Sequence, residues 1–252
     1  MPRSRRSASQ QGYYAMLPNL FTTGNLFMGF FSLISAVNGH FLRAAVLIYV
    51  AMLFDFADGP VARFTGASSH FGVEYDSLAD LLSFGVAPAM LAYLFALSHY
   101  ERYGWLVAFL FAAGAALRLG RFNTKAKPGK ANAYFQGMST PTASGTLAGL
   151  VLLARHFSWG SATKGVIFFV AVPLLAFLMV SSLPYYSFKT VRLSRKQAFY
   201  ATVGVVVLFA AVAARPEIVL PLLFGAYAFS GPVLGLWRWR RTREAAASPA
   251  EE

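Results

Sequence analysis

The sequence predicts an all-α integral membrane protein with about eight transmembrane helices and both termini in the cytosol. Of its 252 residues, 57% are hydrophobic and only 13% are charged, whereas a soluble domain carries about a quarter charged residues. The apolar residues form long blocks, and blocks of roughly 17 to 25 residues have the length of a helix that crosses a bilayer. The third observation is an uneven distribution of Lys and Arg between the two ends of these blocks. Together these features argue against an unusually apolar soluble protein.

Eight blocks qualify as spans. In chain order they cover residues 17–37, 42–63, 75–97, 105–122, 139–157, 164–184, 197–214 and 216–237. The second block is apolar only as far as Phe54 and then becomes acidic. Only Arg215 and Pro216 separate the last two blocks, so the sequence predicts a tight hairpin there.

The positive charges orient these spans. With the N-terminus placed inside, 17 of the 22 Lys and Arg residues fall at inner span ends and 5 at outer ends. Cytosolic loops hold such an excess, so we expect a cytoplasmic (inner) membrane protein with both termini cytosolic. The chain then divides into a basic N-terminal tail (1–16), one transmembrane domain (17–237) and a basic-then-acidic tail (238–252).

Composition also excludes several kinds of site and partner. The sequence contains no cysteine, which rules out disulfides and thiolate metal sites. The net charge of +12 is explained by the topology and by attraction to anionic lipid headgroups. We therefore expect membrane lipids, and no nucleic acid, as partners.

The inner end of the second span carries an acidic face. Asp55, Asp58, Gly59 and Ala62 are spaced i, i+3, i+4 and i+7, so they share one side of a helix. Two carboxylates thus lie beside two residues that have almost no side chain. This arrangement leaves room for a ligand close to the backbone.

The next span begins with a second acidic face. Asp76 and Asp80 are four residues apart, and Gly72 precedes Asp76 by one turn. A short cytosolic turn would bring the two faces together. The guanidinium of Arg63 would add a permanent positive charge and several hydrogen-bond donors for phosphate. Converging carboxylates would repel one another near the membrane, and divalent cations relieve that repulsion because they bind carboxylate oxygens. Two such ions would also hold phosphate oxygens.

Two other interpretations remain open for these carboxylates. A single Asp at a span end is usually a helix cap or an interface charge. A divalent-cation or proton transporter also places carboxylates in spans, although more often at mid-bilayer on broken helices. Neither interpretation requires small residues at the observed spacings.

The acidic faces together resemble a known signature. The pattern Asp55-x2-Asp58-Gly59-x2-Ala62-Arg63-x8-Gly72-x3-Asp76-x3-Asp80 fits that of the CDP-alcohol phosphotransferase family without a gap. The resemblance implies a membrane enzyme that joins a CDP-linked alcohol to a second alcohol and releases CMP. It implies that two Mg²⁺ or Mn²⁺ ions bind to the four aspartates, with Asp80 also acting as the catalytic base. Gly59, Ala62, Arg63 and Gly72 match positions that accommodate the nucleotide.

Further segments resemble the phosphatidylserine synthase branch of that family. They include LPNLFTTGNLFMG at the first span, SFGVAP from Ser83 and LRLGRFNT with Arg118, Arg121 and Asn123. The resemblance implies CDP-diacylglycerol and L-serine as substrates, and a homodimer. Arg118 and Arg121, at i and i+3, could bind the serine carboxylate bidentately.

Charge alone leaves the acceptor open. An inositol phosphate or glycerol 3-phosphate acceptor would also attract arginines, and an ether lipid could replace the diacylglycerol donor. We expect Ser83, Arg118, Arg121 and Asn123 to line the substrate site.

Overall fold

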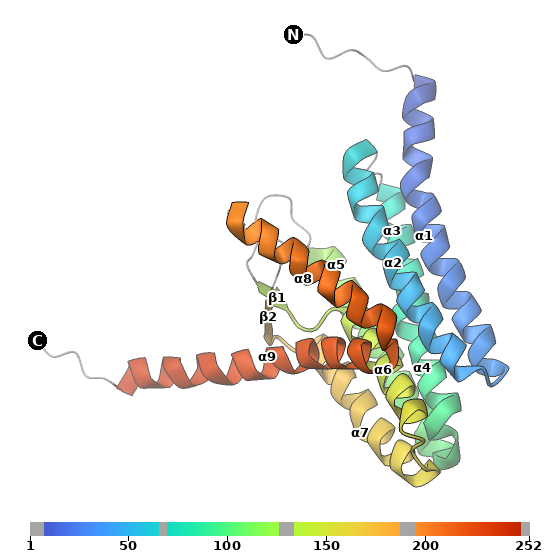
Figure 1. Ribbon diagram of the computed structural model, residues 1–252, viewed down its shortest axis with the longest axis vertical. Helices are drawn as coiled ribbons and strands as arrows, with labels where there is room; N and C mark the ends of the chain where they lie inside the picture. Colours follow the sequence, from blue (N-terminus) through green and yellow to red (C-terminus); the bar gives the residue numbers. More distant parts are fainter. Residues whose placement is uncertain (1–7, 66–69, 126–133, 187–194, 248–252) are drawn as a thin grey trace, which may run out of the picture.

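The computed structural model of the chain describes residues 8–65, 70–125, 134–186 and 195–247 (Figure 1). Nine α-helices are described in these ranges, together with two π-helical turns, one 3-10 turn and two short strands. The first helices are α1 (Ala8–Val37), α2 (Phe41–Thr65), α3 (His70–Asp80), α4 (Ala87–Ala92) and α5 (Glu101–Lys125). The later helices are α6 (Thr140–His156), α7 (Ser161–Val180), α8 (Arg195–Ala214) and α9 (Pro216–Ala247).

The predicted third span is helical but not regular. The π-helical turns η1 (Leu81–Val86) and η2 (Tyr93–Leu97) flank α4, and the 3-10 turn η3 (Ser98–Tyr100) ends this leg. Glu101 then adopts a positive φ of 41°, and the chain reverses into α5. Single π-turns inside helices are frequent at functional sites, and η1 begins directly after Asp80.

The reversal produces a closely packed helical hairpin. A Cβ atom at Gly104 would collide with the carbonyl of Leu97, and one at Gly85 would lie 3.0 Å from Ala115 Cβ. The absence of a side chain at these two positions lets α5 return against η1 and η2. These two close contacts therefore fix the position of α5 relative to η1 and η2.

The helices are long and apolar enough for a multi-pass membrane protein. Five helical segments of the described chain have the length and hydropathy of a span: Asn19–Val37, Phe41–Val61, His70–Thr124, Ser161–Val180 and Pro216–Trp237. The third contains both legs of the hairpin. Phe199–Ala214 is a shorter apolar helix, and α6 has 17 residues, the lower end of the spanning range. Each predicted span thus coincides with a helix or a helical leg, whereas the number of crossings stays a prediction.

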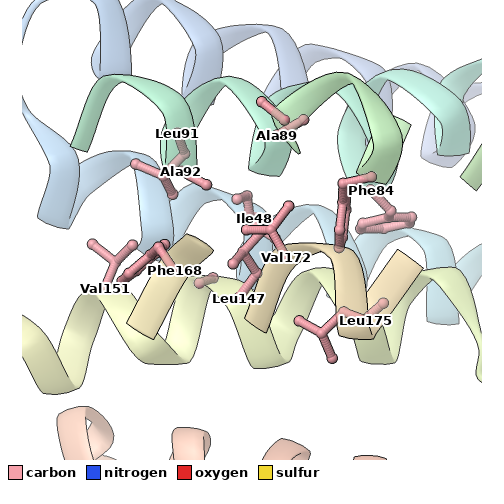
Figure 2. Close-up of a cluster of buried hydrophobic side chains, with 14 of the residues drawn as sticks. Ile48, Phe84, Ala89, Leu91, Ala92, Leu147, Val151, Phe168, Val172 and Leu175 are labelled. Carbon is pink, nitrogen blue, oxygen red and sulfur yellow. The ribbon is translucent and has the colours of Figure 1, made fainter. Parts of the chain in front are cut away.

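The apolar core lies where four helices meet. Figure 2 shows Ile48 of α2, Leu91 of α4, Leu147 of α6 and Val172 of α7 pointing into one cluster. All four side chains are fully buried. Many large apolar side chains elsewhere are exposed, such as Phe56 at 79%, as expected of surfaces that contact lipid.

The structure is all-α apart from one small strand pair, and two of its features were not predicted from the sequence. The strands β1 (Tyr134–Gln136) and β2 (Pro184–Tyr186) form a small antiparallel ladder in which Phe135 faces Tyr185. In addition, α9 runs across the direction of α1 and α2 (Figure 1). The ladder consists of three-residue strands in loops, which produce no alternating sequence pattern.

Glycines fix the position of α9. A Cβ atom at Gly149 of α6 would lie 2.9 Å from Pro221 Cα, and one at Gly231 of α9 would collide with the Tyr185 ring. The Tyr185 hydroxyl donates a 3.1 Å hydrogen bond to the Ala228 carbonyl. Burial, and secondarily the neighbouring Tyr227, raises the pKa of Tyr185 to about 12, so this hydroxyl keeps its proton at neutral pH.

Candidate active site

Three aspartates from two helices converge on one point. Asp55 lies on α2, and Asp76 and Asp80 lie one turn apart on α3. One carboxylate oxygen from each residue lies within 4.8 Å of the other two. Asp55 and Asp76 are half-buried, and Asp80 is the most buried of the three. The i, i+4 spacing on α3 and the packing of both α2 and α3 against α1 thus bring these three aspartates together.

Asp58 lies beside this cluster rather than in it. Its Oδ2 accepts a hydrogen bond of 3.3 Å from Thr22 Oγ1 of α1. Its carboxyl group also lies close to that of Asp76. The fourth predicted aspartate therefore adjoins the other three, and α1 helps to position it.

The donor set fits a divalent cation. The cluster offers only carboxylate oxygens, which hard cations such as Mg²⁺ and Mn²⁺ prefer. Asp76 Oδ1 is buried and has no hydrogen-bond partner among the described residues. A buried carboxylate oxygen without a partner is costly, and a bound cation would satisfy it.

Asp80 is held by a residue of α1. Asn25 donates a hydrogen bond of 3.0 Å from Nδ2 to Asp80 Oδ1. Ser83, predicted to bind substrate, is fully buried and donates from Oγ to the Asn25 carbonyl over 2.9 Å. Ser83 thus supports the segment of α1 that contacts Asp80.

The two arginines of α5 contact different parts of the molecule. Arg118 donates from Nη1 to Thr140 Oγ1 over 2.7 Å and interacts electrostatically with Asp80. Arg121 instead donates to the Val180 carbonyl over 3.2 Å and to Ser182 Oγ over 3.4 Å. Cationic groups near the last carbonyls of a helix stabilise it, so Arg121 acts as a cap for α7.

The other predicted substrate residues occupy the same end of the bundle. Asn123 donates from Nδ2 to Ser77 Oγ over 2.9 Å, which links α5 to α3. Gly59 and Gly72 are half-buried on α2 and α3. The side chains of Ala62 and Arg63 lie outside the part of the chain that the structure describes.

Sequence reasoning did not identify Thr22, Asn25 and Thr140 as site residues. Thr22 and Asn25 are buried polar residues in an apolar span, and their i, i+3 spacing places them on one helix face. That pattern is a usable signal, because polar side chains inside spans usually have partners. Thr140 follows a loop, and its approach to Arg118 depends on how α6 packs against α5.

The sequence is similar to known proteins over most of its length. It matches the CDP-alcohol phosphatidyltransferase family over residues 15–180. A Helicobacter pylori protein named CDP-diacylglycerol–serine O-phosphatidyltransferase is 34% identical over 226 residues, which cover 89% of this chain and 91% of that protein. A Mycobacterium tuberculosis protein of the same name is 31% identical over 230 residues, with coverages of 90% and 79%. The archaetidylserine synthase of Methanothermobacter thermautotrophicus is 35% identical over 174 residues, with coverages of 68% and 70%.

Proposed function

The chain belongs to the CDP-alcohol phosphatidyltransferase family, and we propose that it transfers the phosphatidyl group of CDP-diacylglycerol to the hydroxyl of L-serine. The products are phosphatidylserine and CMP. The observation that carries this proposal is the convergence of Asp55, Asp76 and Asp80 within 4.8 Å at one end of a bilayer-length helix bundle. The names of the relatives support the choice of serine.

In the proposed reaction Asp80 acts as the base. It accepts the proton of the serine hydroxyl while that oxygen forms a new bond to the phosphorus next to the diacylglycerol. The bond from this phosphorus to the CMP oxygen breaks, and CMP leaves with the electron pair. Two Mg²⁺ or Mn²⁺ ions, held by Asp55, Asp58, Asp76 and Asp80, would neutralise the phosphate charge and make the acceptor hydroxyl more acidic.

The nucleotide and the acceptor are assigned to different sides of the cluster. The half-buried Gly59 and Gly72, with Ala62 and Arg63, accommodate the nucleotide and its phosphates. Arg118 binds the serine carboxylate, supported by its bond to Thr140 and its interaction with Asp80. Ser83 and Asn123 complete the acceptor side by supporting α1 and α3, whereas Arg121 supports the end of α7 and is assigned no contact with the acceptor.

The membrane arrangement is part of the same proposal. Eight crossings of the inner membrane with both termini cytosolic place the site at the cytosolic surface, where serine and CMP are soluble. The uneven distribution of Lys and Arg supports this orientation. Lipid tails then enter from the bilayer, and the enzyme functions as a homodimer.

The similarity to an archaetidylserine synthase favours an ether-linked CDP-lipid as a second candidate donor for the same reaction. An ether-linked CDP-lipid would bind to the same aspartates, because its diphosphate group is identical. Comparing the two lipids as donors under one assay distinguishes them.

Release of CMP from CDP-diacylglycerol tests the proposal. Purified protein with Mg²⁺ or Mn²⁺ is given L-serine, glycerol 3-phosphate or an inositol phosphate in separate reactions. Serine-dependent release supports the whole assignment. Release with another acceptor alone retains the aspartate chemistry and rejects serine, whereas no release by folded protein favours the transporter interpretation.

A further inference from the structure

Asn25 is a fully buried polar residue that connects α1 to the predicted base. Its side chain is 0% exposed, and Nδ2 donates to Asp80 Oδ1 over 3.0 Å. Its other side-chain atom, Oδ1, is buried and has no hydrogen-bond partner among the described residues. One end of the amide is therefore satisfied and the other is not.

The backbone around Asn25 is held at close range to the helix that carries Asp80. The Asn25 carbonyl accepts a hydrogen bond from Ser83 Oγ. A Cβ atom at Gly29, one turn further along α1, would collide with the backbone and side chain of Ser83. Because α1 and η1 approach this closely, Asn25 has little freedom to move away from Asp80.

The chemistry of the two groups fixes which way the amide faces. A carboxylate only accepts hydrogen bonds, so the NH₂ end of Asn25 must face Asp80 and the Oδ1 end must face away. Exchanging the two ends would place two acceptors against each other. The unpartnered Oδ1 is thus a consequence of the bond to Asp80.

A buried acceptor without a partner carries the cost of its lost hydration, and polar side chains within spans usually have a partner. A ligand with an N–H donor would satisfy Asn25 Oδ1. Serine carries its ammonium on the carbon next to the one that bears the hydroxyl. One serine molecule can therefore donate a hydrogen bond from its ammonium to one acceptor and from its hydroxyl to a second acceptor at the same time.

We propose that Asn25 both positions Asp80 and selects the acceptor. Its Nδ2 occupies Oδ1 of Asp80 and so leaves Oδ2 to take the proton of the acceptor hydroxyl. Its Oδ1 accepts a hydrogen bond from the ammonium group of the acceptor, which favours amino alcohols over glycerol 3-phosphate or inositol phosphate. This inference rests on the proposed function.

The test compares Asn25→Leu with Ser32→Ala. Leu fills the space of Asn without a polar group. Ser32 is a matched control because it is also on α1 and 0% exposed, and its Oγ donates to the Ala44 carbonyl away from the aspartates. The measurements are kcat and KM for L-serine, the Ki of 3-hydroxypropanoate, which has no donor in place of the ammonium, and CDP-diacylglycerol binding by calorimetry.

Hydrogen bonds to charged groups contribute about 1.5–3 kcal/mol, which corresponds to roughly 10- to 100-fold. For Asn25→Leu we expect kcat to fall and KM for L-serine to rise, each within about that range. The Ki of 3-hydroxypropanoate and the Kd of CDP-diacylglycerol stay within about twofold of wild type. Ser32→Ala keeps kcat and KM and loses only thermal stability.

Two results would overturn the inference while leaving the proposed function intact. One is an Asn25→Leu enzyme with the kcat and KM of Ser32→Ala. The other is an equal rise in the KM of serine and the Ki of 3-hydroxypropanoate. If Asn25→Leu does not fold, Asn25→Ser replaces it, since Ser removes the amide without adding an apolar group. A wild-type enzyme that does not use L-serine rejects the proposed function and this inference together.

Discussion

Arg118 of α5 donates a hydrogen bond of 2.7 Å to the hydroxyl of Thr140, the first residue of α6. Arg118 Nε is buried and has no hydrogen-bond partner among the described residues. The guanidinium is thus held at Nη1 by Thr140 and keeps Nε–H as a further donor. Its charge also interacts with that of Asp80. An acceptor carboxylate next to the base would use that donor.

Replacing Arg118 should affect the acceptor more than the donor. We expect Arg118→Gln to raise KM for L-serine by about 10- to 100-fold, because it removes a charge-assisted hydrogen bond. The Kd of CDP-diacylglycerol should stay nearly unchanged. Steady-state kinetics and calorimetry on the purified protein measure the two quantities.

Arg121→Gln is the matched control for that variant. Arg121 lies one turn away on the same helix, but it contacts the C-terminal end of α7. We expect it to lower thermal stability by up to about 1 kcal/mol and to leave KM for L-serine close to wild type. An Arg121 variant with the larger KM would reverse the two roles.

Removing one carboxylate of the cluster should have opposite effects on stability with and without metal. In EDTA we expect Asp76→Asn to melt at a higher temperature than wild type, because fewer like charges are held together. With saturating Mn²⁺ wild type gains stability by ligand binding, and the variant should gain much less. Melting curves in detergent with and without Mn²⁺ check this, and an equal gain in both proteins would remove Asp76 from the metal site.

Asp80→Asn separates chemistry from binding. The amide keeps the shape of Asp80 but cannot take a proton from the acceptor, so turnover should fall below detection. CDP-diacylglycerol binding should remain largely intact. The measurement pairs CMP release with lipid binding, and a variant that binds lipid and retains turnover would show that another group is the base.

The docking of α9 on α6 depends on Gly149. A Cβ atom there would lie 2.9 Å from the backbone of Pro221, so Gly149→Ala should lower the free energy of unfolding by about 1–3 kcal/mol. At Gly225 of α9 a Cβ atom would meet nothing within 4 Å, and Gly225→Ala should be neutral or stabilising by up to about 1 kcal/mol. Thermal unfolding in one detergent compares the pair, and equal melting temperatures would contradict this packing.

Helix periodicity predicted the part of the site that lies on two neighbouring helices. Asp76 and Asp80 share a face at i, i+4, and α2 and α3 both pack against α1, which brings Asp55 to the same point. The same rule did not predict the behaviour of Arg118 and Arg121. They share one face of α5, yet Arg121 reaches the end of α7 while Arg118 turns toward α6.

The other features of the site and of the fold depend on tertiary packing, which the sequence pattern does not reveal. Asn25 is 55 residues from Asp80, and no local pattern pairs them. The π-turn after Asp80 shifts which residues face the core, so the face of Ser83 could not be read from a regular helix. The β1–β2 ladder and the crosswise path of α9 likewise arise from contacts between distant segments.

The most direct test of the central claim follows the serine itself. Isotopically labelled L-serine is incubated with CDP-diacylglycerol, Mn²⁺ and either wild-type protein or Asp80→Asn, and label in the lipid fraction is compared with CMP. We predict one labelled phosphatidylserine for each CMP with wild type and neither product with the variant. CMP without labelled lipid, or labelled lipid that still forms in the variant, would contradict transfer to serine at the aspartate cluster.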